Sequence, residues 1–168
     1  MKSLLTKKIS RLISIILLGS VSLFGLSVQA ETTFEKIKRT GKVTVGTEAA
    51  FPPFEFVEDG KIVGYGKDIL DYIIADLGVE LNQLDLPWQG ILPGVLAGKF
   101  DFVATSVSIR AERAKKYAFT VPIAEGTNWV MKRSGNNSIM SPDDLSGKVV
   151  CTQLASGSEK ATKEWEAD

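Results

Sequence analysis

The chain has 168 residues, with 20 basic and 20 acidic side chains, one cysteine and no histidine. The absence of histidine excludes a Ser-His-Asp triad, leaves a cysteine nucleophile without its usual base, and removes a main ligand of transition metals. A single cysteine cannot form an internal disulfide. We therefore expect no catalytic residue, no metal and no cofactor, although chemistry that uses carboxylates alone stays open.

Residues 1–30 have the three parts of a secretory signal peptide. Residues 12–26 form an apolar run, too short for a typical membrane span, and Val28-Gln29-Ala30 is a small-x-small cleavage pattern. A basic start precedes the run, at Lys2, Lys7, Lys8 and Arg11. An uncleaved anchor is the alternative, and no cysteine follows Ala30 to carry a lipid. Cleavage after Ala30 leaves 16 basic and 20 acidic residues, a net charge of −4 that argues against nucleic-acid binding.

The first segments after residue 30 predict a helix, a strand and a hairpin. Thr32 or Thr33 can cap a short helix that ends at Gly41, and residues 42–47 have the pattern of a strand. We expect residues 48–54 to form a loop, because Pro52-Pro53 suits neither a helix nor a strand ladder. Residues 54–57 and 61–63 flank a turn sequence and predict a β-hairpin.

The central part of the chain alternates helix and strand patterns. Asp68 is expected to cap a helix whose apolar stripe ends at Gly78. A strand at 79–84, a loop at Pro87-Trp88 and a helix at 91–96 follow, and Pro93 suits only the first turn of that helix. A strand buried on both faces is expected at 100–104 and a helix at 110–116. This order predicts a mainly parallel, doubly wound α/β sheet.

Beyond residue 124 the pattern predicts a second, smaller α/β unit. Strands are expected at 127–132 and at 148–151, and Cys151 is expected to be a buried small hydrophobe. Ser141 and Pro142 start a short helix, and a last helix covers 159–165. Two strands cannot bury both of their faces, so we expect this second unit to be incomplete.

Polar side chains gather where the strand at 100–104 ends. The hydroxyls of Thr105, Ser106 and Ser108 come first, and Arg113 lies in the first turn of the next helix. Ligands bind at the carboxyl ends of strands in open α/β sheets, and an arginine with neutral donors suits a carboxylate. The alternative is that the hydroxyls only cap the helix and Arg113 is a solvated surface charge. The turn at 155–158 offers exposed amides as a second place to hold an anion.

Several segments together carry a resemblance to a known family. They include Phe51-Pro52-Pro53-Phe54 and lie, in this order, at 46–54, 64–69, 88–101, 106–113, 117–122 and 145–150. The set closely resembles the periplasmic polar-amino-acid-binding proteins of ABC importers, bacterial solute-binding protein family 3. The resemblance implies a two-lobed, type II periplasmic-binding-protein fold. Residues 31–125 would form lobe 1, and residues 126–168 a hinge strand and a partial lobe 2, with the return strand absent.

The resemblance also assigns roles to residues. Arg113 would grip the α-carboxylate of the ligand with Ser108, Ser106 would contact the α-amino group, and Thr105 lies beside them. The remaining positions are the aromatic pair Phe51 and Trp88 around the ligand side chain, the acidic Glu48, the lobe 2 turn Ser156, Gly157 and Ser158, and Gln153 near the side chain. Two departures stand out: Glu48 is longer than the usual aspartate, and Ala155 replaces a common glycine.

These roles imply a binding protein and not an enzyme. We expect a periplasmic monomer that captures an amino acid, closes its lobes over it, and delivers it to an ABC permease in the inner membrane. The resemblance leaves the ligand open, because aromatic walls accept cationic, amide and apolar side chains alike. Two alternatives remain on the same fold: a cyclohexadienyl dehydratase-like enzyme acting on arogenate or prephenate, for which Glu48 is the candidate acid, and a sensory module.

Overall fold

The computed structural model describes residues 30–167, so the predicted signal peptide lies outside the described residues except for Ala30. The chain divides into two units, residues 1–35 and 36–168, and the architecture below is that of the second. Helix α2, Thr33–Thr40, begins at the end of the first unit. Its start is capped as predicted: the Thr32 hydroxyl accepts from the Glu35 N–H at 3.2 Å, and the Thr32 N–H donates to the Glu35 carboxylate at 2.8 Å.

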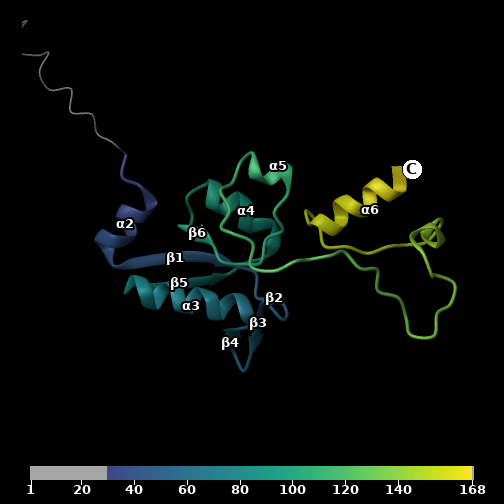
Figure 1. The fold of residues 1–168 in the computed structure, drawn as a ribbon, viewed down its shortest axis with the longest axis horizontal. Coiled ribbons are helices and arrows are strands. Elements are labelled where there is room, and N and C mark those ends of the chain that lie inside the picture. Colours follow the sequence, from purple (N-terminus) through teal and green to yellow (C-terminus); the bar gives the residue numbers. More distant parts are fainter. Residues whose placement is uncertain (1–29, 168) are drawn as a thin grey trace, which may run out of the picture. The chain divides into compact units, whose positions relative to one another are not determined.

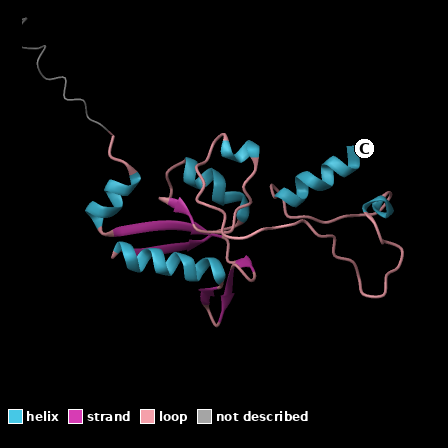
Figure 2. Cartoon of the chain, viewed as in Figure 1, coloured by secondary structure: helices cyan, strands magenta, loops and turns pink. Residues whose placement is uncertain are grey.

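A three-stranded parallel sheet forms the centre of the second unit (Figures 1 and 2). Strand β1, Lys42–Thr47, lies between β5, Glu80–Asp85, and β6, Phe102–Val103. The predicted parallel pairing is confirmed. The buried strand is β1, whereas β6 is short, lies at the edge and is only half-buried. The expectation of a strand at 100–104 buried on both faces was therefore wrong, because the strand covers only Phe102–Val103 and both of these residues stay partly exposed.

Helices cover both faces of this sheet, which confirms the doubly wound α/β class. On one face, Val43 and Val45 of β1 are fully buried against Leu70 of α3, Tyr65–Leu77, and Ile37 of α2. On the other face lies α4, Trp88–Leu96, which contributes the fully buried Ile91. Figure 1 shows α3 and α4 on opposite sides of the strands. The alternation of side chains along β1 sends successive residues to the two helices.

Phe100 joins β1 to α4. Its side chain is buried, and its ring lies against the backbone of both Gly46 and Gly94. A Cβ added at either glycine would lie 2.6 Å from a ring carbon. Both positions therefore need glycine for lack of space, and the packed ring sets the distance between strand and helix.

A second, antiparallel sheet extends from the end of β1. It consists of β2, Ala50–Phe51, β3, Glu55–Glu58, and β4, Lys61–Val63. The predicted hairpin is confirmed, and its turn uses the left-handed residues Asp59 and Gly60. The expected loop at 48–54 was wrong in part: the two residues before Pro52 pair with β3, and the prolines interrupt the strand only after them.

Three helix starts differ from the sequence prediction. Helix α3 begins at Tyr65 after an N-terminal Gly64, so Asp68 lies within its first turn, where a negative charge suits the helix dipole. Helix α4 begins at Trp88, which was expected in a loop, and Pro93 lies inside the helix beyond the first turn. Packing of Ile91 and the close approach at Gly94 outweigh the cost of an internal proline. The predicted helix at 110–116 is the single turn α5, Ala111–Ala114.

The segment from 121 to 156 contains one helical turn. A 3₁₀ turn, η1, covers Pro142–Leu145 and has the predicted Ser141 cap, which shares a capping box with Asp144. Helix α6, Gly157–Ala167, confirms the predicted last helix and begins two residues earlier. The predicted strands at 127–132 and 148–151 are not formed.

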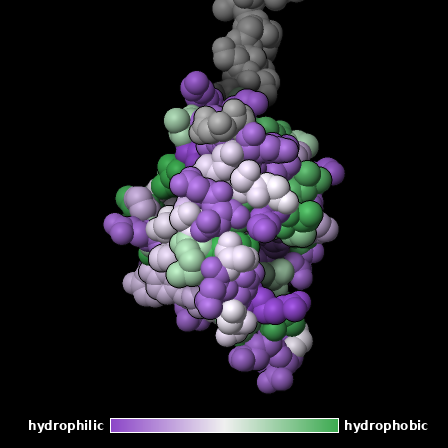
Figure 3. All heavy atoms as spheres, turned by 90° about the vertical axis from the view of Figure 1, so that its right-hand side faces the viewer, coloured by the Kyte–Doolittle hydropathy of each residue, from purple (hydrophilic) through white to green (hydrophobic). Residues whose placement is uncertain are grey.

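A strand needs a partner for its backbone groups, and neither of these segments pairs with a strand of the described chain. Their apolar side chains are consequently exposed: Trp129 by 85%, Met131 by 96% and Val149 by 95%. Cys151, predicted to be buried, is exposed for the same reason. The molecular face in Figure 3 shows hydrophobic side chains at the surface among hydrophilic ones. Among residues 30–167, no helix combines the length and the apolar character that a membrane span requires.

Candidate functional site

Arg113 lies where three segments of the chain meet. Its guanidinium is centred 5.3 Å from the ring of Trp88, a cation–π arrangement, and its Nη1 donates to the backbone oxygen of Ser108 at 3.1 Å. The Trp88 indole N–H in turn donates to the backbone oxygen of Ala155 at 3.0 Å. Arg113 is half-buried and oriented by these contacts. These contacts disfavour the alternative of a freely solvated surface charge.

The surroundings of Arg113 disfavour its charge. Burial is the largest effect and lowers the pKa of its guanidinium, and repulsion from the nearby charge of Arg110 lowers it further. Among the described residues, Arg113 makes no ion pair within 4 Å. A guanidinium held in this way would be stabilised by an anion from outside.

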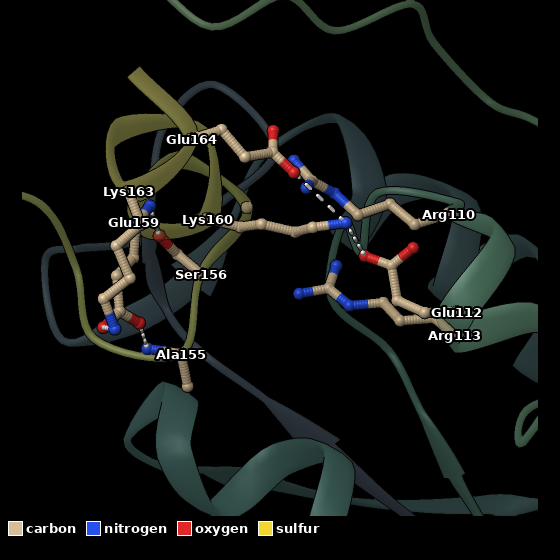
Figure 4. A pocket seen from close by; sticks show the side chains of 10 residues that line it. Arg110, Glu112, Arg113, Ala155, Ser156, Glu159, Lys160, Lys163 and Glu164 are labelled. Atoms are coloured by element: carbon tan, nitrogen blue, oxygen red, sulfur yellow. Dashed lines mark hydrogen bonds and ion pairs between the residues drawn. The ribbon is translucent and has the colours of Figure 1, made fainter. Parts of the chain in front are cut away.

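An open cavity of about 510 Å³ lies between α5 and the start of α6 (Figure 4). It brings together three of the predicted site residues, Arg113, Ser156 and Gly157. Ala155 belongs to the turn at 155–158 that was expected to hold an anion, and the other lining residues were not predicted: Arg110, Glu112, Glu159, Lys160, Lys163 and Glu164. Four cationic and three anionic side chains line the cavity, so it carries a net charge of +1.

The hydroxyls of Thr105 and Ser106, which follow β6, turn toward a buried carboxyl group and not toward this cavity. Ser106 Oγ donates to Glu55 Oε1 at 2.9 Å, and Thr105 Oγ1 donates to Glu55 Oε2 at 3.3 Å. The Ser106 N–H also donates to Oε2 at 3.1 Å. The alternative that these hydroxyls only cap the next helix is wrong, because α5 begins after Arg110 with no side-chain cap.

Glu55 is the functional candidate that the sequence interpretation missed. It is 3% exposed, and burial is the largest of the effects that raise the pKa of its carboxyl group. A Cβ at Gly66 would overlap this carboxyl, so the glycine in the first turn of α3 leaves room for it. The sequence pattern points the other way, because alternation places the apolar Phe54 and Phe56 on one face of the strand and Glu55 on the opposite face, which is normally polar.

Glu48, Phe51 and Gln153 have partners of their own outside the cavity. Glu48 Oε1 accepts from Gln153 Nε2 at 2.5 Å, which joins residues predicted on either side of a binding cleft. Phe51 is 47% exposed and stacks on Phe54 with ring centroids 5.4 Å apart. The structure thus brings Glu48 to Gln153 and Trp88 to Arg113, while Phe51 and Trp88 have no ring contact with each other among the described residues.

The turn before α6 is shaped by its own hydrogen bonds. Ser156 Oγ accepts from the Glu159 N–H at 3.1 Å, and Ser158 Oγ donates to Asn128 Oδ1 at 3.1 Å. Ala155, which replaces a common glycine in the resemblance, has φ 60° in the left-handed region. That backbone conformation explains why glycine would suit the position. Within the described part of the chain, no group of three or more Cys, Asp or Glu side chains is placed to hold a metal ion.

Comparison with known proteins identifies the class. Residues 43–166 match the family model of bacterial extracellular solute-binding proteins, family 3, and the chain belongs to this family. The α/β fold of periplasmic binding proteins, predicted from the sequence, is thereby confirmed.

Individual relatives give the same result. The chain is 33% identical over 141 residues to the L-cystine-binding protein TcyJ of Escherichia coli K12, covering 81% of this chain and 53% of the relative. A mutant of ArgBP from T. maritima superimposes with a TM-score of 0.76 at 32% identity, over 80% of this chain and 60% of that one. The arginine-bound form of a mutant of domain 1 from TmArgBP superimposes with a TM-score of 0.51 at 42% identity, over 54% of this chain and 70% of that one. This chain spans about half the length of the curated relative.

Proposed function

We propose that the protein is a periplasmic solute-binding protein that captures an amino acid and delivers it to an ABC-type importer. The observation that carries the proposal is the half-buried Arg113 guanidinium, which lies on Trp88, has no ion-pair partner among the described residues and lines the cavity beside α6. An oriented and unpaired guanidinium favours a carboxylate. The family and the named relatives support an amino acid as the molecule that carries it.

In this proposal the ligand binds in two steps. Residues 31–125 form lobe 1 and take the α-carboxylate with Arg113 and Ser108, while Ser106, beside Thr105, would turn from Glu55 to face the α-amino group. Trp88, against Arg113, lies nearest the ligand side chain, and Glu48 and Phe51, which do not line the cavity, would meet it only in the closed form. Residues 126–168 belong to the hinge and lobe 2, and the turn Ser156, Gly157 and Ser158 completes the carboxylate site. Closure is a shift between two populations that the ligand favours by its extra contacts in the closed form.

The relatives support some parts of this proposal more directly than others. The arginine-bound form of a single domain of TmArgBP supports the assignment of the first ligand contacts to lobe 1. Secretion by a signal peptide cleaved after Ala30, a monomeric state and docking on an inner-membrane permease rest on the sequence pattern and on the family.

The enzymatic alternative has less support. Its candidate acid, Glu48, is hydrogen-bonded to Gln153 and does not line the cavity. The compared relatives are named as binding proteins. Incubation with prephenate and arogenate, followed by absorbance, tests this alternative: product formation would favour the dehydratase function over transport.

A thermal-shift screen of the twenty amino acids tests the proposed function. A ligand that binds only the folded state raises the melting temperature, and at 100 times its dissociation constant it adds about 2.7 kcal/mol of stability. We expect at least one L-amino acid to raise the melting temperature, and its decarboxylated amine to have no effect. A flat profile across all twenty would contradict the proposal.

A further inference from the structure

Arg110 places a second guanidinium at the cavity. Neither the sequence motifs nor the family resemblance assigned a role to this residue. It precedes the first residue of α5 and is half-buried. Figure 4 shows the guanidinium groups of Arg110 and Arg113 both directed from α5 toward α6. A Cβ at Gly157 would overlap the Arg110 guanidinium, so this group lies directly against the first turn of α6.

The carboxylates that line the cavity already have cationic partners. Lys160 pairs with Glu112 at 3.2 Å and with Glu164 at 3.6 Å, and Lys163 pairs with Glu159 at 2.7 Å. Neither guanidinium is within 4 Å of a carboxylate in the described part of the chain. The two lysines and three glutamates together carry −1, and the two arginines carry +2 and repel each other, so the cavity keeps a net charge of +1.

We propose that Arg110 binds a second acidic group of the ligand, so that the cavity selects an amino acid with a side-chain carboxylate. Arg113 holds the α-carboxylate and Arg110 the side-chain carboxylate. This inference rests on the proposed function and names the ligand class of the same site. Two unpaired guanidinium forks directed into one cavity offer two bidentate carboxylate sites. A ligand with two carboxylates also removes the repulsion between the arginines.

The same charges disfavour a cationic amino acid. Its side chain would approach two guanidinium groups, and it would have to displace a lysine to reach a glutamate. A neutral amide side chain meets no such repulsion, but it leaves Arg110 without a counter-charge. The ranking we expect is therefore acid above amide, and amide above cation.

The test is calorimetric titration of the full-length protein with L-aspartate, L-glutamate, L-asparagine, L-glutamine and L-arginine. The acids and their amides have the same shape and differ in charge. A charged hydrogen bond contributes enough for about tenfold or more in affinity, so each acid should bind at least about tenfold more tightly than its amide. Arg110→Gln should bring this ratio close to one, while Arg110→Lys should keep part of it. The matched control is Arg133→Gln, at an exposed arginine outside the cavity, and it should keep the full ratio of acid to amide affinity.

The outcomes separate the inference from the function on which it rests. Equal binding of acids and amides, tightest binding of L-arginine, or a preference that survives Arg110→Gln would overturn the inference and leave amino-acid binding intact. If none of the twenty amino acids binds, both are wrong. The first two outcomes are read from the affinities of the wild-type protein alone. They therefore test the inference even if the Arg110→Gln variant does not fold.

Discussion

The hydroxyl of Ser106 donates a 2.9 Å hydrogen bond to Oε1 of Glu55, a carboxyl group that is 3% exposed. Glu55 belongs to the antiparallel sheet, and Ser106 follows the last strand of the parallel sheet. The bond therefore links the two sheets at the start of the segment that leads from β6 to Arg113. We infer that Glu55 is a positioning residue for that segment.

The first prediction concerns the pH dependence of stability at Glu55. Because burial raises the pKa of this carboxyl, the folded state holds its proton to a higher pH than the unfolded state. The contribution of Glu55 to folding stability is fully present below its pKa in the unfolded state, about 4.3. It is lost as the pH rises through the pKa in the folded state. Glu55→Gln imitates the protonated form. Urea unfolding should show the wild type losing stability relative to Glu55→Gln as the pH rises; a constant difference would contradict this.

The second prediction concerns Asp101, whose pKa is shifted in the opposite direction, so that its contribution to stability is lost in acid. Burial alone would raise its pKa, but hydrogen bonds from Lys36 at 2.7 Å and from the Thr44 N–H at 2.8 Å outweigh burial and lower it. Its contribution is therefore present above the unfolded pKa and is lost as the pH falls through the folded one.

Asp101→Asn should thus cost stability at pH 7 and progressively less toward about pH 2. Urea unfolding at several pH values measures this difference. The exposed Asp76, which makes no ion pair within the described residues, provides the control, and Asp76→Asn should change stability little at pH 7. A cost for Asp101→Asn that persists unchanged in acid would show that the carboxylate charge is not what stabilises the fold.

The third prediction concerns the space around Phe100. Gly46→Ala places a methyl group 2.6 Å from the Phe100 ring and should destabilise the protein by about 1–3 kcal/mol through overpacking. Gly90→Ala is the matched control, because no atom lies within 4 Å of a Cβ there and alanine favours a helix. Denaturant midpoints measure both. The double variant Gly46→Ala with Phe100→Leu should be less destabilised than the sum of the two single variants, and strict additivity would contradict the packing account.

The fourth prediction concerns Trp88. Its ring supports the Arg113 guanidinium, and its indole N–H holds the backbone of Ala155. Trp88→Phe keeps a ring but removes the hydrogen bond, whereas Trp88→Leu removes both contacts. Amino-acid affinity should fall modestly in Trp88→Phe and several-fold more in Trp88→Leu, because a cation–π contact contributes about 0.5–2 kcal/mol. Equal affinities in calorimetry would show that the ring does not position the arginine.

Local patterns in the sequence predicted most of the parallel sheet and its helices. Residues 42–45 alternate between polar and apolar side chains, Gly78 ends α3 in a left-handed conformation, and Asp59-Gly60 forms the hairpin turn. These features depend on neighbouring residues and are visible in the sequence. The strands expected at 127–132 and 148–151 failed because a strand also needs a partner, which its own sequence does not specify.

The candidate site was predictable only in part for the same reason. Arg113 follows from its place after β6 and from the resemblance, and it lines the cavity. Glu55 and Arg110 could not be assigned, since their roles depend on contacts across 51 and 47 positions of sequence, with Ser106 and with Gly157. The ligand contacts predicted for the remaining residues, among them Phe51 and Ser158, stay predictions.

The most direct test of the central claim is calorimetric titration of the full-length protein and its Arg113→Ala variant with the amino acid that the thermal-shift screen selects. Arg133→Ala, at an exposed arginine outside the cavity, is the control. A charged hydrogen bond contributes about 1.5–3 kcal/mol, so Arg113→Ala should weaken binding at least about tenfold while Arg133→Ala leaves it unchanged. Undiminished affinity in a folded Arg113→Ala protein would contradict the account.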